Sequence, residues 1–148
     1  MHNALLERAI TICSQKKLRF TAIRQRVFLL MLEQKGAVSA YELLEQLQKH
    51  DSGAKPPTIY RALDFLLEHH FIHRIESLNA YLKCEHFGCE HPMQLLICEQ
   101  CKQVIELSDR VIDNAFSVQA EQSGFKITNK ILEAHGICHN CLYNEPSL

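Results

Sequence analysis

The chain is poor in glycine and has no long apolar run, and each of these shortages excludes a class of protein. Its five glycines among 148 residues leave little material for a glycine-rich phosphate loop, and neither a G-x-S-x-G nor an H-E-x-x-H motif occurs. No stretch approaches the ~20 continuous apolar residues that a membrane span requires. The sequence therefore predicts neither an enzyme with a small-molecule substrate nor a membrane protein.

A secretory signal is also missing. The N-terminal segment "MHNALLERAITICSQKK" is amphipathic and carries charges within its apolar part. We therefore expect a cytoplasmic protein, whose thiols stay reduced. Seven cysteines and nine histidines in a reducing compartment indicate metal ligands rather than disulfides.

Charge is distributed unevenly along the chain, although the formal net charge is only -1. Residues 1–84 carry 12 Lys/Arg against 8 Asp/Glu, whereas residues 85–148 carry 4 against 9. Such asymmetry indicates two different tasks, and the basic half is the better candidate for contact with nucleic acid.

Hydrophobic periodicity predicts four helices and a β-hairpin in the first half. The third helix begins with a capping box, and the fourth begins with two prolines, which suit a first helical turn. The predicted elements are a helix from Asn3 to about Lys17, a helix capped by Thr21 and ending at Gly36, a helix headed by Ser39 and Glu42, the helix "PPTIYRALDFLLEHH" from Pro56, and a hairpin turning at Ser77–Asn79. Helices followed by a hairpin are typical of a winged helix-turn-helix domain.

The second half predicts a smaller α/β domain, so the fold class is α+β. Its predicted elements are a hairpin of Gln94–Cys98 and Gln103–Leu107, a helix from about Asp109 to Ser123 ended by Gly124, and a half-buried strand in "FKITNKILE" with Phe125, Ile127 and Ile131 on one face. The predicted domains are 1–84 and 93–148, joined by the linker "EHFGCEHP" at 85–92.

Two C-x-x-C pairs, separated by 36 residues, are the strongest chemical signal. Cys98, Cys101, Cys138 and Cys141 can supply four thiolates in a tetrahedral array around one zinc ion. A redox motif of the thioredoxin type would need the pair at a helix start after a strand, whereas the first pair lies between two strands. A closed set of four thiolates has no open position, so it predicts a structural zinc site.

Further metal donors surround the linker, and they are His73, Cys84, His86, Cys89, His91 and Glu106. Four donors drawn from both halves could hold one ion and thereby join the halves. Alternatively, the histidines and Glu106 are solvated surface, and Cys84 is a buried small side chain. The spacing alone does not decide between these interpretations.

The outer face of the fourth helix carries polar groups suited to DNA, namely Thr58, Tyr60, Arg61, Asp64 and Glu68. Arg61 could reach a guanine edge in the major groove, and Tyr60 could contact a phosphate or a thymine methyl group. An exposed arginine is usually only solvated, but the helix-turn-helix context favours contact with DNA.

Three segments together resemble the ferric uptake regulator family, most closely its zinc uptake regulator branch. They are "AKPPTIYRALDFLLEHHFIHRIESLNAYLKC", "ICEQCKQVIE" and "EAHGICHNC". The resemblance extends from about Leu5 to Cys141. It implies a winged-helix DNA-binding domain, a hinge and an α/β dimerisation domain.

The resemblance also implies two zinc ions per chain. A structural ion would be held by the paired cysteines, and a regulatory ion at the hinge would be held by His73, Cys84, His91 and Glu106. A thiolate and imidazoles favour zinc over the nitrogen and oxygen donors of iron-sensing relatives. Cys89 or His86 could replace one of these ligands or add to them.

The implied function is that of a transcriptional repressor of zinc-uptake genes. A zinc-loaded homodimer would bind an AT-rich inverted repeat in double-stranded DNA, with one fourth helix per half-site. The predicted DNA contacts are Arg61, Tyr60, Tyr41, Arg24 and Thr58. The segment Thr21-Ala22-Ile23-Arg24 departs from the Thr-Pro-Gln-Arg frequent in the family and keeps only its basic position.

Two other functions remain open from the sequence. A regulator of the same family could sense peroxide or another metal, with Cys89 or a zinc-bound thiolate as the oxidisable group. Alternatively, a zinc-ribbon module could bind protein, with the basic half a coincidence. Salt-dependent affinity would separate a DNA-binding protein from the second of these.

Overall fold

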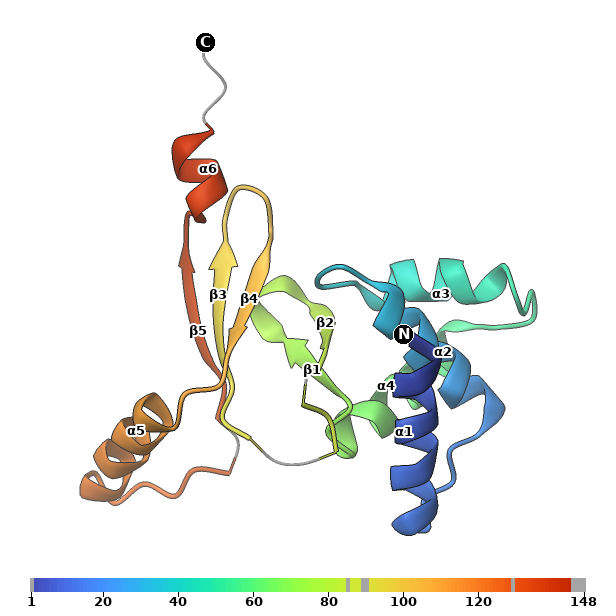
Figure 1. Cartoon of the computed structure of the whole chain (residues 1–148), viewed down its shortest axis with the longest axis horizontal. Helices are drawn as coiled ribbons and strands as arrows, with labels where there is room; N and C mark the ends of the chain where they lie inside the picture. Colours follow the sequence, from blue (N-terminus) through green and yellow to red (C-terminus); the bar gives the residue numbers. More distant parts are fainter. Residues whose placement is uncertain (1, 85, 89–90, 129, 145–148) are drawn as a thin grey trace. The chain divides into compact units, whose positions relative to one another are not determined.

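The computed structural model describes residues 2–84, 86–88, 91–128 and 130–144. The chain divides into two compact units, Met1–Glu90 and His91–Leu148, which we call unit 1 and unit 2 (Figure 1). The predicted domain limits stay predictions, because residues 85, 89 and 90 of the predicted linker lie outside the described residues. No helix in the described ranges has the length and apolarity needed to cross a membrane.

Unit 1 contains four helices followed by a two-stranded sheet, as predicted. Its elements are α1 (His2–Gln15), α2 (Ala22–Glu33), α3 (Ala40–Gln48), α4 (Pro56–Glu68), β1 (Ile72–Ile75) and β2 (Ala80–Lys83). The Thr21 side chain caps α2, and Ser39 and Glu42 form the predicted capping box at α3. Helix α2 ends three residues before the predicted Gly36, because Gln34 already adopts an extended conformation.

Aromatic side chains make up much of the core of unit 1. Phe28 lies edge-on to Phe71 with ring centroids 5.4 Å apart, and Phe20 stacks on both Phe65 and Phe71. Around them pack aliphatic residues from α2, α3 and α4, including Val27, Leu43, Leu47, Ile59, Leu63 and Leu66. Burying each such side chain contributes about 1.5–3 kcal/mol, so this face of α4 is firmly held and its other face is left to solvent.

The wing is the antiparallel hairpin of β1 and β2, in which His73 pairs with Leu82. A short 3-10 turn joins the strands, and Asn79 ends it with a φ of 48°, a conformation that asparagine tolerates better than most residues. An isolated bridge between Val38 and Tyr81 adds the segment before α3 to this sheet. The wing is therefore tied directly to the helical part of unit 1.

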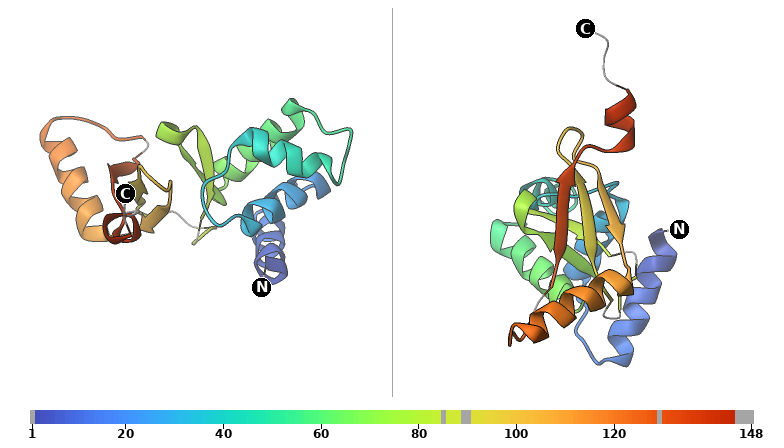
Figure 2. Two further views of the ribbon diagram at one scale, coloured as in Figure 1. Left: turned by 90° about the horizontal axis from the view of Figure 1, so that it is seen from above. Right: turned by 90° about the vertical axis from the view of Figure 1, so that its left-hand side faces the viewer.

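Unit 2 consists of a mixed three-stranded sheet with two helices. Its elements are β3 (Gln94–Cys98), β4 (Val104–Leu107), α5 (Arg110–Gln122), β5 (Leu132–Gly136) and α6 (His139–Tyr143). The strand order is β4-β3-β5, visible in the right-hand view of Figure 2. Strand β3 pairs antiparallel with β4, as predicted, and parallel with β5. Asp109 caps α5, and Gly124 follows it with a φ of 65°.

The strand predicted over "FKITNKILE" is wrong for most of its length. Residues 125–128 and 130–131 are not in a strand, and β5 begins only at Leu132. The Lys130 ammonium group instead binds Asp113 and donates to Ser117 Oγ at 2.7 Å, which ties this segment to α5. Its apolar residues line a cavity of about 260 Å³ beside Phe116, so their alternation reflects packing near a helix.

Candidate metal and nucleic-acid sites

The four paired cysteines converge at one end of the sheet of unit 2. Their Sγ atoms all lie within 4.8 Å of one another. The sheet explains the convergence, because the parallel register of β3 and β5 places Cys98 beside Gly136, two residues before Cys138. Cys101 lies in the turn after β3, where Lys102 adopts a φ of 63°, and Cys141 lies in α6.

The spacing and hydrogen bonding of these thiols fit a zinc ion. Cys101 Sγ and Cys138 Sγ are 3.7 Å apart, and sulfurs at ~2.3 Å from a tetrahedral zinc are separated by about 3.8 Å. The amides of Cys101 and Cys138 donate to Cys98 Sγ, which lowers the pKa of that thiol to about 6. Such amide donors stabilise a thiolate, the form that binds metal.

Cys141 shows the opposite pKa shift from Cys98. Its thiol donates a hydrogen bond to Cys138, and together with burial this raises the pKa of Cys141 to about 12. The four sulfurs therefore share protons as long as no positive charge lies among them. A divalent ion would replace those protons, since only the thiolate form ligates metal.

Unit 1 contributes two of the predicted hinge donors, both on its wing. Cys84 donates its amide hydrogen to the carbonyl of Phe71 at 3.1 Å, which continues the ladder in which His73 faces Leu82. In an antiparallel pair, this register places the side chains of His73 and Cys84 diagonally on the same face. Cys84 is buried and His73 is half-buried.

Unit 2 contributes the other two predicted hinge donors. His91 Nε2 lies 3.4 Å from Glu106 Oε1, and the two side chains are only 11% and 10% exposed. Glu106 lies on β4 opposite Leu95 of β3, and His91 precedes β3 by three residues. A carboxylate beside an imidazole, both half-buried, is chemically suited to a shared metal ion.

Three further cysteines and histidines were candidates for a role in the site or in chemistry. Cys89 lies outside the described residues, so its predicted role as an alternative ligand stays open. His86 is exposed. Cys13 is buried on α1, and this burial raises the pKa of its thiol, as is typical of a small core residue rather than a nucleophile.

Three of the five predicted DNA contacts lie on the surface of unit 1. Tyr60 and Arg61 project from the face of α4 opposite its buried residues, and Tyr60 is 50% exposed. Tyr41, in the first turn of α3, is 70% exposed. Phenol and guanidinium groups on exposed helix surfaces are suited to contact with phosphates and with base edges in the major groove.

The other two predicted contacts make local interactions instead. The Arg24 guanidinium lies 4.2 Å from the centroid of the Phe65 ring, and it also donates to the carbonyl of Arg19. The Thr58 hydroxyl accepts a hydrogen bond from the amide of Lys55 at 3.3 Å. Arg24 thus braces α2 against α4, and Thr58 stabilises the start of α4; their contact with DNA stays a prediction.

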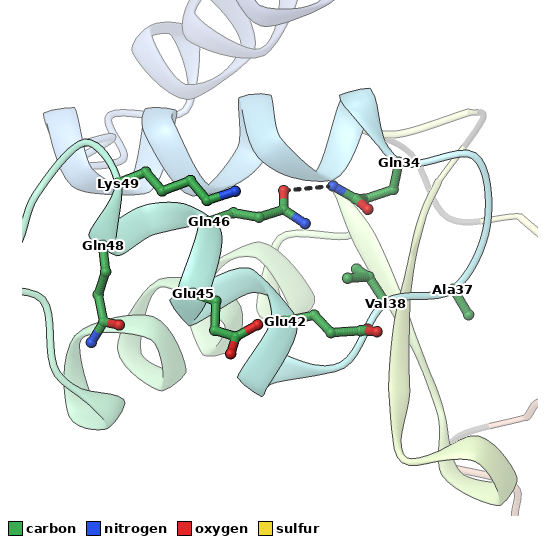
Figure 3. Close-up of a pocket in the computed structure, with 8 residues that line it drawn as sticks. All are labelled: Gln34, Ala37, Val38, Glu42, Glu45, Gln46, Gln48 and Lys49. Atoms are coloured by element: carbon green, nitrogen blue, oxygen red, sulfur yellow. Dashed lines mark hydrogen bonds between the residues drawn. The ribbon is translucent and has the colours of Figure 1, made fainter.

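An open hollow of about 640 Å³ runs along α3 (Figure 3). Gln34 Nε2 donates to Gln46 Oε1 at 3.0 Å across it. The carboxylates of Glu42 and Glu45 lie on its wall, and their negative charge disfavours DNA phosphates. We therefore exclude this hollow from the candidate DNA surface.

Comparison with known proteins places these sites in context. The Zinc uptake regulation protein of Escherichia coli (strain K12) is 42% identical over 139 residues, covering 93% of this chain and 81% of that protein. A solved zinc uptake regulator in complex with zinc and DNA has a TM-score of 0.92 at 40% identity, covering 96% of this chain and 95% of that one. The crystal structure of holo XcZur has a TM-score of 0.87 at 37% identity, covering 95% and 98%. Since residues 15–141 also match the sequence profile of the Ferric uptake regulator family, the chain belongs to that family.

Proposed function

We propose that this protein is a zinc-responsive transcriptional repressor of zinc-uptake genes, active in the cytoplasm as a homodimer on an AT-rich inverted repeat. One observation carries the proposal: each unit presents a pair of donors suited to zinc, His73 with Cys84 in unit 1 and His91 with Glu106 in unit 2. The names of its relatives, which bind zinc and DNA, support it.

We assign two zinc ions to each chain. The four-cysteine cluster would hold a structural ion, because its thiolates fill every tetrahedral position. The pairs of donors in unit 1 and unit 2 would together hold the regulatory ion. Its mixed set of one thiolate, two imidazoles and one carboxylate suits zinc and reaches it from elements on both sides of the linker.

The regulatory response follows from where these donors lie. A bound zinc ion supplies a divalent charge and up to four directional bonds. Zinc bound by all four donors would link the wing, through His73 and Cys84, to unit 2, through His91 and Glu106, and would thereby restrict the motion of one unit relative to the other. Shifting a two-state balance from 1:99 to 99:1 takes ~5.5 kcal/mol, and thiolate-containing sites release ~10–16 kcal/mol.

A second copy of the chain is the partner that unit 2 requires. Helix α5, every residue of which the structure describes, has no buried side chain. Val111, Ile112, Phe116 and Val118 are all more than 40% exposed on this helix, and Val111 reaches 76%. Apolar surface of this kind marks an interface, and a two-fold dimer would place two α4 helices on the two halves of an inverted repeat.

Binding of DNA across buffered zinc concentrations tests this function. A duplex selected from a randomised pool at saturating zinc would be titrated with protein at increasing free zinc and at several salt concentrations. We expect affinity to rise with zinc and to fall with salt, with a slope of about -0.9 per phosphate contacted. Zinc-independent affinity that changes after peroxide treatment would favour a redox sensor, and no salt dependence would favour a protein-binding module.

The Arg61→Ala variant should weaken specific binding. Loss of an arginine that reads a purine edge costs about 1–3 kcal/mol, or about 5- to 150-fold in affinity, and relaxes specificity at one position of each half-site. Fluorescence anisotropy with the selected duplex and with single-base variants would measure both effects. The matched control is Arg110→Ala, which removes an exposed arginine from unit 2. Equal losses in the two variants would show that charge alone matters.

A further inference from the structure

The chain does not leave unit 1 immediately after Cys84. Three residues further on, Phe87 is only 2% exposed and belongs to the aromatic core of that unit. Its ring lies edge-on to Phe28 and tilted against Phe71, with both centroid distances at 5.4 Å. Part of the predicted linker is therefore a core element of unit 1.

Helix α1 covers this segment from the other side. The Arg8 guanidinium lies 4.9 Å from the centroid of the Phe87 ring. Gly88 has a φ of 90°, and a Cβ atom on it would lie 2.8 Å from Ile12 Cδ1. The backbone passes so close to α1 that only glycine fits without displacement. Phe28 and Phe71 thus contact residue 87 from the core, and residues of α1 contact both residue 87 and residue 88.

We propose that Phe87, clamped by α1, is a positioning residue for the regulatory zinc site. This inference rests on the proposed function, because it concerns the donors on either side of the segment. With Phe87 and Gly88 docked, His91 is tethered to unit 1 through three residues instead of the seven that follow Cys84. Three residues span at most ~10 Å, whereas seven span ~25 Å.

The shorter tether should raise the effective concentration of the unit 2 donors near those of unit 1. Loop-closure entropy alone makes the effective concentration about 4-fold higher for a tether of three residues than for one of seven. An undocked tether also leaves the chain free to point in any direction, which increases this difference. We therefore expect undocking of Phe87 to weaken zinc binding at the regulatory site about 4- to 10-fold, without altering any ligand.

The central test uses Phe87→Ala and Phe87→Leu in the full-length dimer loaded with structural zinc. Competition with a zinc chelator would measure the affinity of the regulatory site. Phe87→Ala should lose about 4- to 10-fold, and Phe87→Leu, which still fills the core, should recover most of it. Leu47→Ala is the matched control, because it removes a fully buried side chain of α3 in the same unit. Equal losses in Phe87→Ala and Leu47→Ala would overturn the inference.

A second variant keeps the inference testable if Phe87→Ala fails to fold. Gly88→Ala should weaken regulatory zinc binding, because a residue with a Cβ is strained at a φ of 90° and its Cβ also meets Ile12. In chelator, where only structural zinc remains, the melting temperature of Phe87→Ala should already lie below that of the wild type. Wild-type affinity for regulatory zinc in Gly88→Ala would contradict docking.

The same titration separates this inference from the proposed function. If the wild type binds two zinc ions and Phe87→Ala binds the second one equally well, only the positioning role fails. If the wild type binds a single ion and its DNA affinity ignores zinc, the proposed function fails and the positioning role fails with it.

Discussion

Cys101→Ser is expected to release the zinc ion of the four-cysteine cluster and to unfold most of unit 2. The side chain of Cys101 is exposed, so the substitution removes a metal ligand and almost no packing. Structural zinc sites contribute ~10–16 kcal/mol to folding, which equals or exceeds the ~5–15 kcal/mol that stabilises a whole domain. The loss therefore cannot be absorbed by the remaining contacts of so small a unit.

The small number of buried residues in unit 2 supports this expectation. Its buried residues among those described all belong to β3 or immediately precede it: Met93, Gln94, Leu95, Ile97 and Cys98. A unit of this size with so few buried side chains generally depends on metal, disulfides or association. We therefore expect a zinc ion at the four cysteines to contribute much of the stability of unit 2.

Metal analysis, circular dichroism and sedimentation would test Cys101→Ser together. We expect the zinc content to fall by one or more ions per chain, the β-sheet signal of unit 2 to be lost, and the dimer to dissociate. Cys13→Ala is the matched control, since it removes a cysteine from the core of unit 1 and should keep the zinc content unchanged. A Cys101→Ser protein that remains a zinc-replete dimer would refute the structural role of the cluster.

Cys84→Ser is expected to abolish zinc-dependent binding of DNA and to leave the folded dimer intact. Serine nearly matches cysteine in size but is a poor zinc ligand, so the core of unit 1 is preserved while the regulatory site loses its one thiolate. Affinity for the selected duplex should fall towards the non-specific range of about 10⁻⁴–10⁻⁶ M, a loss of at least about 100-fold relative to typical specific binding.

The zinc content of Cys84→Ser distinguishes loss of the regulatory ion from loss of the structural ion. Cys84→Ser should retain one ion per chain at the four-cysteine cluster, measured by metal analysis, and should sediment as a dimer. His50→Ala is the control in unit 1, because His50 is exposed and lies outside the proposed zinc site, so this variant should bind DNA in a fully zinc-dependent manner. Wild-type affinity of Cys84→Ser in the presence of chelator would exclude the proposed mechanism.

The helices of unit 1 were predictable because their ends carry local chemical signals. The capping box of Ser39 and Glu42 and the prolines before Thr58 act within one turn. Likewise, the cysteine pairs could be recognised from spacing alone, since each pair occupies a single turn of chain. The prediction that both pairs bind one ion required only that the two turns lie close together in the folded chain, as they do.

Strand β5 was misplaced because its pairing is not local. The alternation of Phe125, Ile127 and Ile131 has the period of a strand, but no neighbouring strand pairs with that stretch among the described residues. Instead, Leu132–Gly136 pairs in parallel with Gln94–Cys98, a partner more than thirty residues earlier. Periodicity in one segment carries no information about such a partner, and helix α6 after it is too short to show any periodicity.

Side-chain contacts across elements were also beyond prediction. Arg24 was predicted to contact DNA because it keeps the basic position of a segment frequent in the family, and the contact of its guanidinium with Phe65 of another helix could not be foreseen. Phe87 was assigned to the linker because the segment 85–92 contains glycine and proline. Only the folded chain brings it to Phe28 and Phe71. Both cases depend on distances between segments far apart in sequence.

The parallel pairing of β5 also sets an order of assembly during synthesis. Unit 1 is complete in sequence once Glu90 has left the ribosome, whereas unit 2 lacks its last strand and two of its thiols until Cys141 follows. Roughly 50 residues separate these points, which at ~5–20 residues per second takes about 3–10 s. During this interval each nascent chain contains a complete unit 1 but lacks the complete unit 2 through which we propose that it dimerises.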